Sequence, residues 1–252
     1  MERCSGPHDS ALMTQSSRAT PYATPIVALD FWMADAALQM VDLLGDRCDF
    51  YKVGGELFTV AGPTIVRQLV ARGKRVFLDL KFHDIPNTVE KATAAAAELG
   101  ASIVTVHASG GLRMIRAAVD IAGPGCEVFA VTVLTSLSGT DLDAVWGGAR
   151  RGGGSDLTPD VLRLARLAKD AGVAGVVCSG LEAPVLRDRF GADLKLLVPG
   201  VRLPGSDRGD QTRVVTPAEA AQAGASYVVL GRTVTSADDP RAAMDQAVAS
   251  LA

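Results

Sequence analysis

Eight short apolar runs, separated by longer stretches with helical periodicity, follow one another along the chain from Pro25 onward. The runs are rich in Val, Ile and Leu and lie at residues 26–29, 50–53, 76–80, 103–106, 128–134, 175–178, 194–198 and 227–230. Continuous apolar strands are typical of a parallel sheet covered on both faces, and their alternation with helices indicates βα units. Eight units in residues 25–252 favour an α/β fold, a single-domain (β/α)8 TIM barrel, over an open doubly wound sheet, which is the alternative.

Residues with strong positional preferences mark where the intervening helices begin and end. Thr158 and Thr216 each precede a proline, which predicts a threonine N-cap followed by proline at the first helical position. Glu219 adds a capping box to the second of these starts. Four glycines directly before predicted strands are expected to be left-handed C-caps: Gly73, Gly100, Gly172 and Gly224.

Composition restricts the partners and the compartment. The chain has 25 Lys and Arg against 28 Asp and Glu, so it lacks the basic footprint of a nucleic-acid-binding protein. No window reaches the roughly 18 uninterrupted apolar residues that a membrane span requires. The four cysteines are widely spaced, without the spacing of a zinc site, and indicate a reducing compartment. We therefore expect a cytoplasmic protein.

The first 24 residues differ from the rest of the chain. They are rich in Ser and Thr and lack the apolar region of about 7 to 15 residues that a signal peptide contains. We expect a flexible N-terminal extension over residues 1–24, with Met13 as an alternative start, and a catalytic barrel domain over residues 25–252. Within that domain, the glycine-rich segment 147–155 is expected to be a flexible loop.

Charged residues gather at the carboxyl ends of the first three predicted strands. Asp30 ends the first strand and Lys52 lies near the end of the second, while Asp79 and Lys81 belong to the third and Asp84 follows it. Alternate side chains of a strand share a face, so Asp79 and Lys81 both point toward the barrel mouth, where barrel enzymes hold their active sites. An ion pair at the rim of the barrel is the simpler interpretation of these charges. Burying five charges costs several kcal/mol per ion unless they pair, which favours a functional array.

A lysine flanked by carboxylates is held in its ammonium form, which suits a proton donor or an electrostatic anchor. A lysine that forms an imine must instead be a neutral amine. The charge pattern therefore disfavours a class I aldolase mechanism.

A second group of residues, after predicted strands seven and eight, is suited to a phosphate group. Loops at these positions form the recurrent phosphate site of such barrels; Gly231 allows close approach of backbone N–H groups, and Arg232 supplies a bidentate cation. A simple turn is the alternative for this Gly-Arg pair. The long polar segment between Gly200 and Thr216, which contains Arg202 and Gln211, is predicted to be a lid that orders on binding. Together these features predict a phosphorylated ligand.

The run from Asp79 to Thr88, DLKFHDIPNT, resembles the signature of the orotidine 5'-phosphate decarboxylase family, which makes UMP in pyrimidine biosynthesis. The similarity extends over residues 25–252 and includes segments 131–136, 198–202, 209–217 and 231–232. The D-x-K-x-x-D spacing alone marks a wider group of barrels. The flanking residues 83–88, with the lid and the Gly-Arg pair, narrow the resemblance to the decarboxylase.

The resemblance implies a role for each of these residues. Lys81 would protonate C6 of the pyrimidine, and Asp79 would lie beside the departing carboxylate. Lys52 and Asp84 would complete the charge row, with Asp84 and Thr88 reaching in from the other subunit of a homodimer. The remaining substrate contacts would be Asp30 at the ribose, Thr135 at the pyrimidine, and Arg202, Gln211, Gly231 and Arg232 at the phosphate and its lid.

The resemblance also implies that no metal or organic cofactor takes part. The nearest rival is the magnesium-dependent group of 3-keto-gulonate 6-phosphate decarboxylases and hexulose-phosphate synthases, which shares the barrel and the D-x-K-x-x-D spacing. A non-enzymatic barrel that binds nucleotide phosphate is a second alternative. We expect His107 to be a hydrogen-bonded rim residue rather than a general base, and Trp32 to pack a helix against the barrel.

Overall fold

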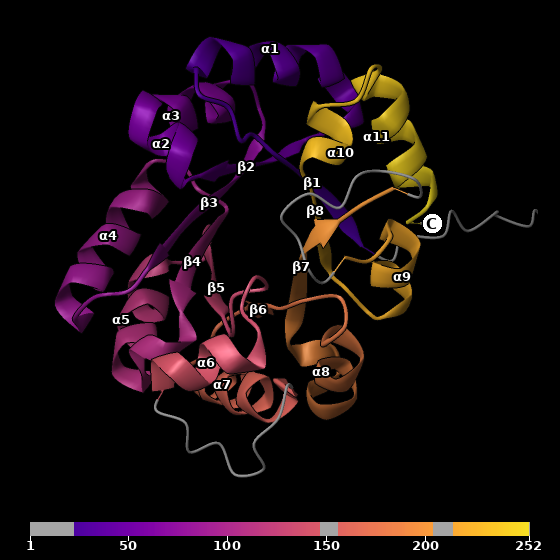
Figure 1. Ribbon diagram of the computed structural model, residues 1–252. Coiled ribbons are helices and arrows are strands. Elements are labelled where there is room, and N and C mark those ends of the chain that lie inside the picture. The colour runs from indigo at the N-terminus through magenta and orange to yellow at the C-terminus, as the bar shows by residue number, and fades with distance from the viewer. Residues whose placement is uncertain (1–22, 147–155, 204–213, 252) are drawn as a thin grey trace, which may run out of the picture.

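The computed structural model describes residues 23–146, 156–203 and 214–251, which form one closed barrel surrounded by helices (Figure 1). Eight parallel strands pair in chain order, and the first pairs with the last. They are β1 (Thr24–Ala28), β2 (Phe50–Gly54), β3 (Arg75–Phe82), β4 (Ile103–His107), β5 (Glu127–Val131), β6 (Gly175–Val177), β7 (Lys195–Val201) and β8 (Tyr227–Leu230). The predicted (β/α)8 barrel is confirmed, and each strand lies on one of the predicted apolar runs.

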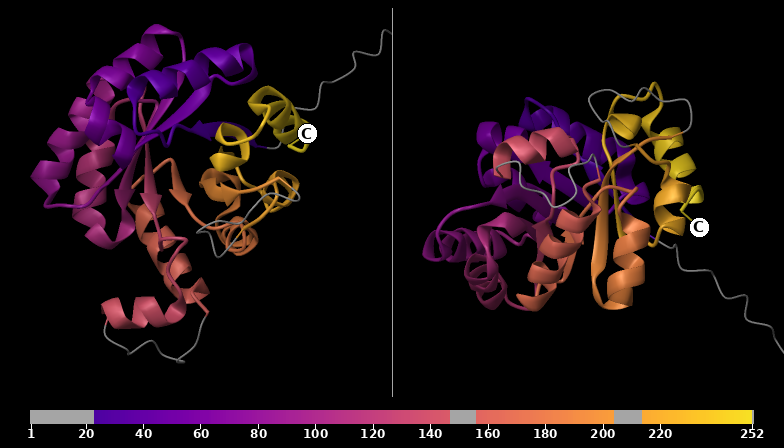
Figure 2. Two further views of the ribbon diagram at one scale, coloured as in Figure 1. Left: turned by 45° about the horizontal axis from the view of Figure 1, so that its top comes forward. Right: turned by 60° about the horizontal axis from the view of Figure 1, so that its bottom comes forward.

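Helices connect the strands and form the outer layer. They are α1 (Ala34–Leu44), α2 (Gly55–Ala61), α3 (Thr64–Ala71), α4 (Pro86–Glu98), α5 (Leu112–Ala122), α6 (Gly139–Trp146), α7 (Thr158–Asp170), α8 (Ala183–Phe190), α9 (Pro217–Gln222), α10 (Arg232–Thr235) and α11 (Pro240–Ala249). Short 3-10 turns lie at Gly45–Arg47, Ala108–Gly110 and Gly191–Asp193. The last helix, α11, packs beside α1 and closes the ring (Figure 2). No helix in the described ranges is long and apolar enough to cross a membrane.

The helix ends test the predicted caps. All four glycines predicted as C-caps have positive φ, between 71° and 91°. Thr216 and Glu219 form the predicted capping box at α9. The prediction for Thr158 is wrong: α7 begins at Thr158 itself with Leu157 as N-cap, because the Asp156 carboxylate already accepts the Thr158 N–H at 2.9 Å.

Two boundaries differ from those expected. β1 begins at Thr24, which pairs with Tyr227, so the last residue of the predicted extension belongs to the barrel. β5 ends at Val131, before the end of the predicted run at residue 134, and the N–H and hydroxyl of Thr132 both donate to the Val177 carbonyl, at 3.3 and 3.0 Å. Residues 1–22 of the predicted extension, and the predicted flexible loop 147–155, lie outside the described residues.

The barrel interior is filled at its amino end and open at its carboxyl end. Phe50 and Phe129 pack edge-on against Tyr227, with ring centroids 5.9 and 5.8 Å apart. The guanidinium of Arg75, at the start of β3, lies 4.0 Å from the Phe50 ring centroid. A second and larger apolar core lies between the barrel and the helices. Because the amino end is packed, functional groups must come from the carboxyl ends of the strands.

Candidate active site

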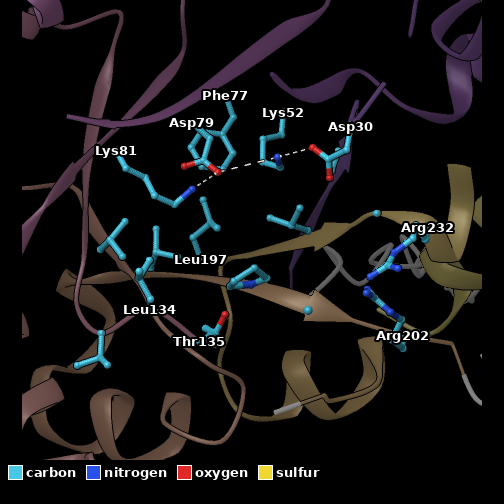
Figure 3. Close-up of a pocket in the computed structure, with 18 residues that line it drawn as sticks. Asp30, Lys52, Phe77, Asp79, Lys81, Leu134, Thr135, Leu197, Arg202 and Arg232 are labelled. Carbon is cyan, nitrogen blue, oxygen red and sulfur yellow. Dashed lines mark hydrogen bonds and ion pairs between the residues drawn. The ribbon is translucent and has the colours of Figure 1, made fainter. Parts of the chain in front are cut away.

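The charged residues at the ends of β1, β2 and β3 form one continuous row of alternating sign (Figure 3). Lys52 Nζ lies 2.9 Å from Asp30 Oδ1 and 3.9 Å from Asp79 Oδ2. Lys81 Nζ lies 2.8 Å from the same Asp79 oxygen. The structure therefore brings together four of the residues that the sequence singled out, each carboxylate beside at least one ammonium group.

Strand alternation explains why Lys52 and Asp79 share the barrel interior. Lys52 follows Phe50 by two residues and Asp79 follows Phe77 by two, and both phenylalanines belong to the interior apolar cluster. The charges thus form a layer directly above that cluster. The side chains of Lys52 and Asp79 are only 13% and 12% exposed, so water screens their interaction weakly.

Gly54 leaves room for the Lys52 ammonium group. A Cβ at position 54 would lie 2.9 Å from Lys52 Nζ and 3.5 Å from Asp30 Oδ1. Contacts between a Cβ and its neighbours are ordinarily 3.4 to 4 Å. A side chain at this position would therefore displace Lys52 from its place between the two carboxylates.

The backbone at Lys81 departs from regular strand geometry. Its φ is 50°, and within the described residues it is the one non-glycine residue with positive φ. The register between β3 and β4 shifts between Leu78 and Phe82, so the strand bulges where it carries Asp79 and Lys81. The sequence did not predict this bulge, nor the contact of both residues with Thr105 on β4.

A cavity of about 260 Å³ opens at the carboxyl end of the barrel. Eight of the predicted site residues line it: Asp30, Lys52, Asp79, Lys81, Thr135, Arg202, Gly231 and Arg232. Sequence reasoning missed its apolar walls, because valines and leucines in strands carry no functional signal; these are Ala28, Phe77, Val131, Val133, Leu134, Val177, Leu197, Pro199 and Val229. An apolar middle between two charged ends suits a flat ring that carries a charged group on either side.

Two arginines lie on the side of the cavity away from the charge row (Figure 3). Arg202 directly follows β7 and is buried, with its Nη1 donating to the Val201 carbonyl at 3.1 Å. Arg232 begins α10, and the neighbouring Thr233 hydroxyl donates to the same carbonyl at 3.3 Å. Two guanidinium groups on one side of a cavity favour a doubly charged anion such as a phosphate monoester.

Three predicted site residues do not line this cavity. Asp84 and Thr88 are exposed, Asp84 in the loop after β3 and Thr88 in α4. The Asp84 carboxylate accepts the N–H of Ile85 at 2.6 Å. Gln211, with the rest of segment 204–213 of the predicted lid, lies outside the described residues. At the base of that segment, the Arg202 N–H donates to the Val215 carbonyl at 3.0 Å.

His107, at the end of β4, lies against a second histidine. The centroids of its ring and that of His83 are 5.3 Å apart. Burial, with the charges of His83 and Lys81, lowers the pKa of His107 below its ordinary value. These surroundings therefore favour the neutral form of His107. Within the described residues, no group of three or more His, Cys, Asp and Glu side chains is arranged to hold a metal ion.

The expectation for Trp32 is wrong. Its side chain is 73% exposed in the loop after β1, where Met33 is also exposed. Ile85, in the loop after β3, is exposed as well. Large apolar side chains therefore stand on the loops that follow β1 and β3, and Trp32 does not pack a helix against the barrel.

Comparison with known proteins gives consistent matches over nearly the whole chain. The model of the "Orotidine 5'-phosphate decarboxylase / HUMPS family" matches residues 24–247. An orotidine 5'-phosphate decarboxylase of Vibrio parahaemolyticus is 47% identical over 233 residues, which cover 90% of this chain and 97% of the relative. One from Salmonella typhimurium is 47% identical over 244 residues, covering 94% and 96%. The crystal structure of orotidine 5'-phosphate decarboxylase from Lactobacillus acidophilus matches with a TM-score of 0.78 and 39% identity, covering 91% and 99%.

Proposed function

The chain belongs to the orotidine 5'-phosphate decarboxylase / HUMPS family, and from this premise we propose that it is a carboxy-lyase that converts orotidine 5'-phosphate to UMP and CO2 in pyrimidine biosynthesis. The observation that carries the proposal is one cavity with a Lys-Asp charge row at one end and two arginines at the other. The first end is suited to a carboxylate that is lost as a neutral molecule, and the second to a phosphate that remains.

The cavity has residues that suit each part of the proposed substrate. Arg202 and Arg232 take the phosphate dianion, with Gly231 allowing its close approach to the backbone. The pyrimidine ring lies over the apolar walls, with Thr135 beside its polar edge. Asp30 and Lys52 then face the ribose hydroxyls. This pose directs the C6 carboxylate toward Asp79 and Lys81.

Asp79 destabilises the substrate relative to the transition state. At about 4 Å from a substrate carboxylate, its charge repels by about 4 kcal/mol at an effective dielectric of about 20. The repulsion disappears as neutral CO2 leaves, which corresponds to about three powers of ten in rate. Enzymes lower barriers by roughly 8 to 23 kcal/mol, so this repulsion supplies only part of the acceleration.

Lys81 supplies the rest through its ammonium group. When the bond between C6 and the carboxylate breaks, its electron pair stays on C6, and Lys81 Nζ stabilises that charge and donates a proton to it. The Asp79 oxygen at 2.8 Å orients the ammonium group from one side. Lys81 recovers its proton from solvent after UMP leaves. The neighbouring Lys52 and Asp79 side chains are only 13% and 12% exposed, so water screens their charges weakly, whereas the Lys81 side chain is 37% exposed and open to the cavity.

We further propose that the enzyme is a homodimer in which Asp84 and Thr88 complete the partner's site. Both residues are exposed and lie outside the cavity of their own chain, on the segment that leaves β3. Exposed Trp32, Met33 and Ile85 on the loops after β1 and β3 supply apolar surface for such a contact.

Co-expression of two inactive variants tests this arrangement. A dimer of one Lys81→Ala chain and one Asp84→Ala chain contains one intact site if Asp84 acts across the interface. Random pairing then restores about a quarter of wild-type activity. If Asp84 acts within its own chain, no activity returns.

The cytoplasmic location expected from the sequence stays a prediction.

A spectrophotometric assay tests the reaction itself. Purified protein should consume orotidine 5'-phosphate, release one CO2 for each UMP formed, and keep its rate in EDTA. Turnover of 3-keto-gulonate 6-phosphate that is lost in EDTA would support the magnesium-dependent rival instead. Binding of UMP without any CO2 release from orotidine 5'-phosphate would support a non-enzymatic barrel.

A further inference from the structure

We propose that Thr105 is a positioning residue: its hydroxyl holds the carboxylate of Asp79 and the backbone of Lys81 in a single geometry. The inference rests on the proposed function, because it assigns the two residues that Thr105 contacts to the decarboxylation step. Thr105 itself does not line the cavity, and it acts only through these neighbours.

The hydroxyl of Thr105 makes two hydrogen bonds whose directions are fixed by chemistry. Its Oγ1 lies 2.9 Å from Asp79 Oδ1 and 3.0 Å from the backbone nitrogen of Lys81. An ionised carboxylate only accepts and an amide N–H only donates, so the single hydroxyl proton goes to Asp79 and the oxygen accepts from Lys81. Thr105 is fully buried, so water does not replace these bonds.

The bulge in β3 explains why a side chain is needed at this point. Leu78 is opposite Val104 and Phe82 is opposite Val106, so residues 79–81 together are opposite Thr105 alone. The Lys81 N–H uses the Thr105 side chain as its acceptor where a regular ladder would use a carbonyl. This bond stabilises Lys81 at a φ of 50°, a conformation that residues with side chains rarely adopt.

Because of the bond from Thr105, the two carboxylate oxygens of Asp79 have different partners. Oδ1 is held by Thr105, which leaves Oδ2 to face the ammonium groups of Lys81 and Lys52, at 2.8 and 3.9 Å. Without the hydroxyl, the carboxylate can rotate, and the Lys81 backbone loses its acceptor at the same time. Both changes misplace the groups that act on the C6 carboxylate, while the arginines at the phosphate end are unaffected.

Variants that differ by one hydroxyl test this role. Thr105→Val keeps the shape and removes both hydrogen bonds, whereas Thr105→Ser keeps the hydroxyl. Thr132→Val is the matched control, because Thr132 is also buried and its hydroxyl donates to the Val177 carbonyl at 3.0 Å, away from the charge row. If Thr105→Val does not fold, Thr105→Ala replaces it with the same expectation.

We expect Thr105→Val to lower kcat about 10- to 100-fold, since misplacing reacting groups by about 1 Å costs on the order of 100-fold. The KM for orotidine 5'-phosphate and the Kd for UMP should stay within about twofold, because the phosphate contacts are intact. Thr105→Ser should recover most of the rate, and Thr132→Val should match the wild type. A crystal structure of Thr105→Val should show a changed Lys81 backbone and a rotated Asp79 carboxylate.

Three results would overturn the role of Thr105: a wild-type kcat in Thr105→Val, an equal loss of rate in Thr132→Val, or unchanged positions of Asp79 and Lys81 in the crystal structure. The last result is independent of turnover. Wild-type turnover of orotidine 5'-phosphate, measured first, tests the proposed function separately, so failure of one inference is distinguishable from failure of the other.

Discussion

Replacing Asp79 with Asn is expected to change substrate affinity and reaction rate in opposite directions. The substitution keeps the shape of the side chain and an acceptor for the Thr105 hydroxyl, but removes the negative charge that faces Lys81 at 2.8 Å and Lys52 at 3.9 Å. It also removes the repulsion of about 4 kcal/mol between Asp79 and a substrate carboxylate at about 4 Å. The substrate should therefore bind more tightly while it reacts more slowly.

The size of the effect follows from that repulsion. We expect kcat to fall by about three powers of ten. The Kd for orotidine 5'-phosphate should fall as well, so kcat/KM should change less than kcat. Because UMP has no carboxylate, its affinity should hardly change. Loss of the counter-ion between two lysines should lower the free energy of unfolding by about 3 kcal/mol, at the low end of the range for buried pairs, since Lys52 keeps Asp30 at 2.9 Å.

The assay combines steady-state kinetics with calorimetric titration of both nucleotides. The slow variant allows the Kd of the substrate to be measured directly before it is consumed. Equally changed affinities of Asp79→Asn for orotidine 5'-phosphate and UMP, or a fall in kcat of less than about tenfold, would show that the Asp79 charge does not act by repelling the substrate carboxylate.

Three further perturbations have distinct expected outcomes. Arg232→Ala should raise the KM about 10- to 100-fold with little change in kcat, because a charge-assisted phosphate contact is lost; an unchanged KM would contradict the phosphate assignment. Gly54→Ala should lower kcat/KM about tenfold by displacing the Lys52 ammonium, which would be only 2.9 Å from the new Cβ, while the Tm stays close to that of the wild type; unaltered kinetics would count against this explanation. Because burial lowers the pKa of His107 below 6.5, its contribution to stability is present above pH 6.5 and is lost as the pH falls through its folded-state pKa. Thermal unfolding at pH 7.5 and 5.5 should then show a smaller decrease in Tm for His107→Gln than for the wild type, and equal decreases would show that His107 does not contribute.

The barrel could be predicted because the sequence signals for its strands and helix ends are local. Each strand is a short apolar run, and each of Gly73, Gly100, Gly172 and Gly224 marks the end of a helix with a left-handed backbone. Both kinds of signal depend on neighbouring residues only. Eight apolar runs in succession therefore specify the order of the strands without knowledge of any long-range contact. The prediction of Thr158 as N-cap was wrong because Leu157 takes that position and the Asp156 carboxylate, two residues earlier, accepts the Thr158 N–H.

The site was only partly predictable, for a physical reason. Strand alternation places Asp79 and Lys52 above Phe77 and Phe50, so their convergence follows from sequence spacing. The bulge that brings Thr105 opposite Asp79 and Lys81 depends on the register between two strands, which spacing within one strand does not specify. The one available signal was a hydroxyl residue within the apolar run of β4.

Delivery of a proton to C6 by Lys81, within a site that the rest of the row holds in place, is the step on which the proposed reaction depends. Release of CO2 from orotidine 5'-phosphate by Lys81→Ala should be measured beside the Kd of that variant for UMP. We expect a rate at least about 10⁴-fold below that of the wild type, with UMP affinity within about tenfold, since proton donation and charge stabilisation are lost but the phosphate contacts remain. Turnover close to the wild-type rate in Lys81→Ala would contradict it.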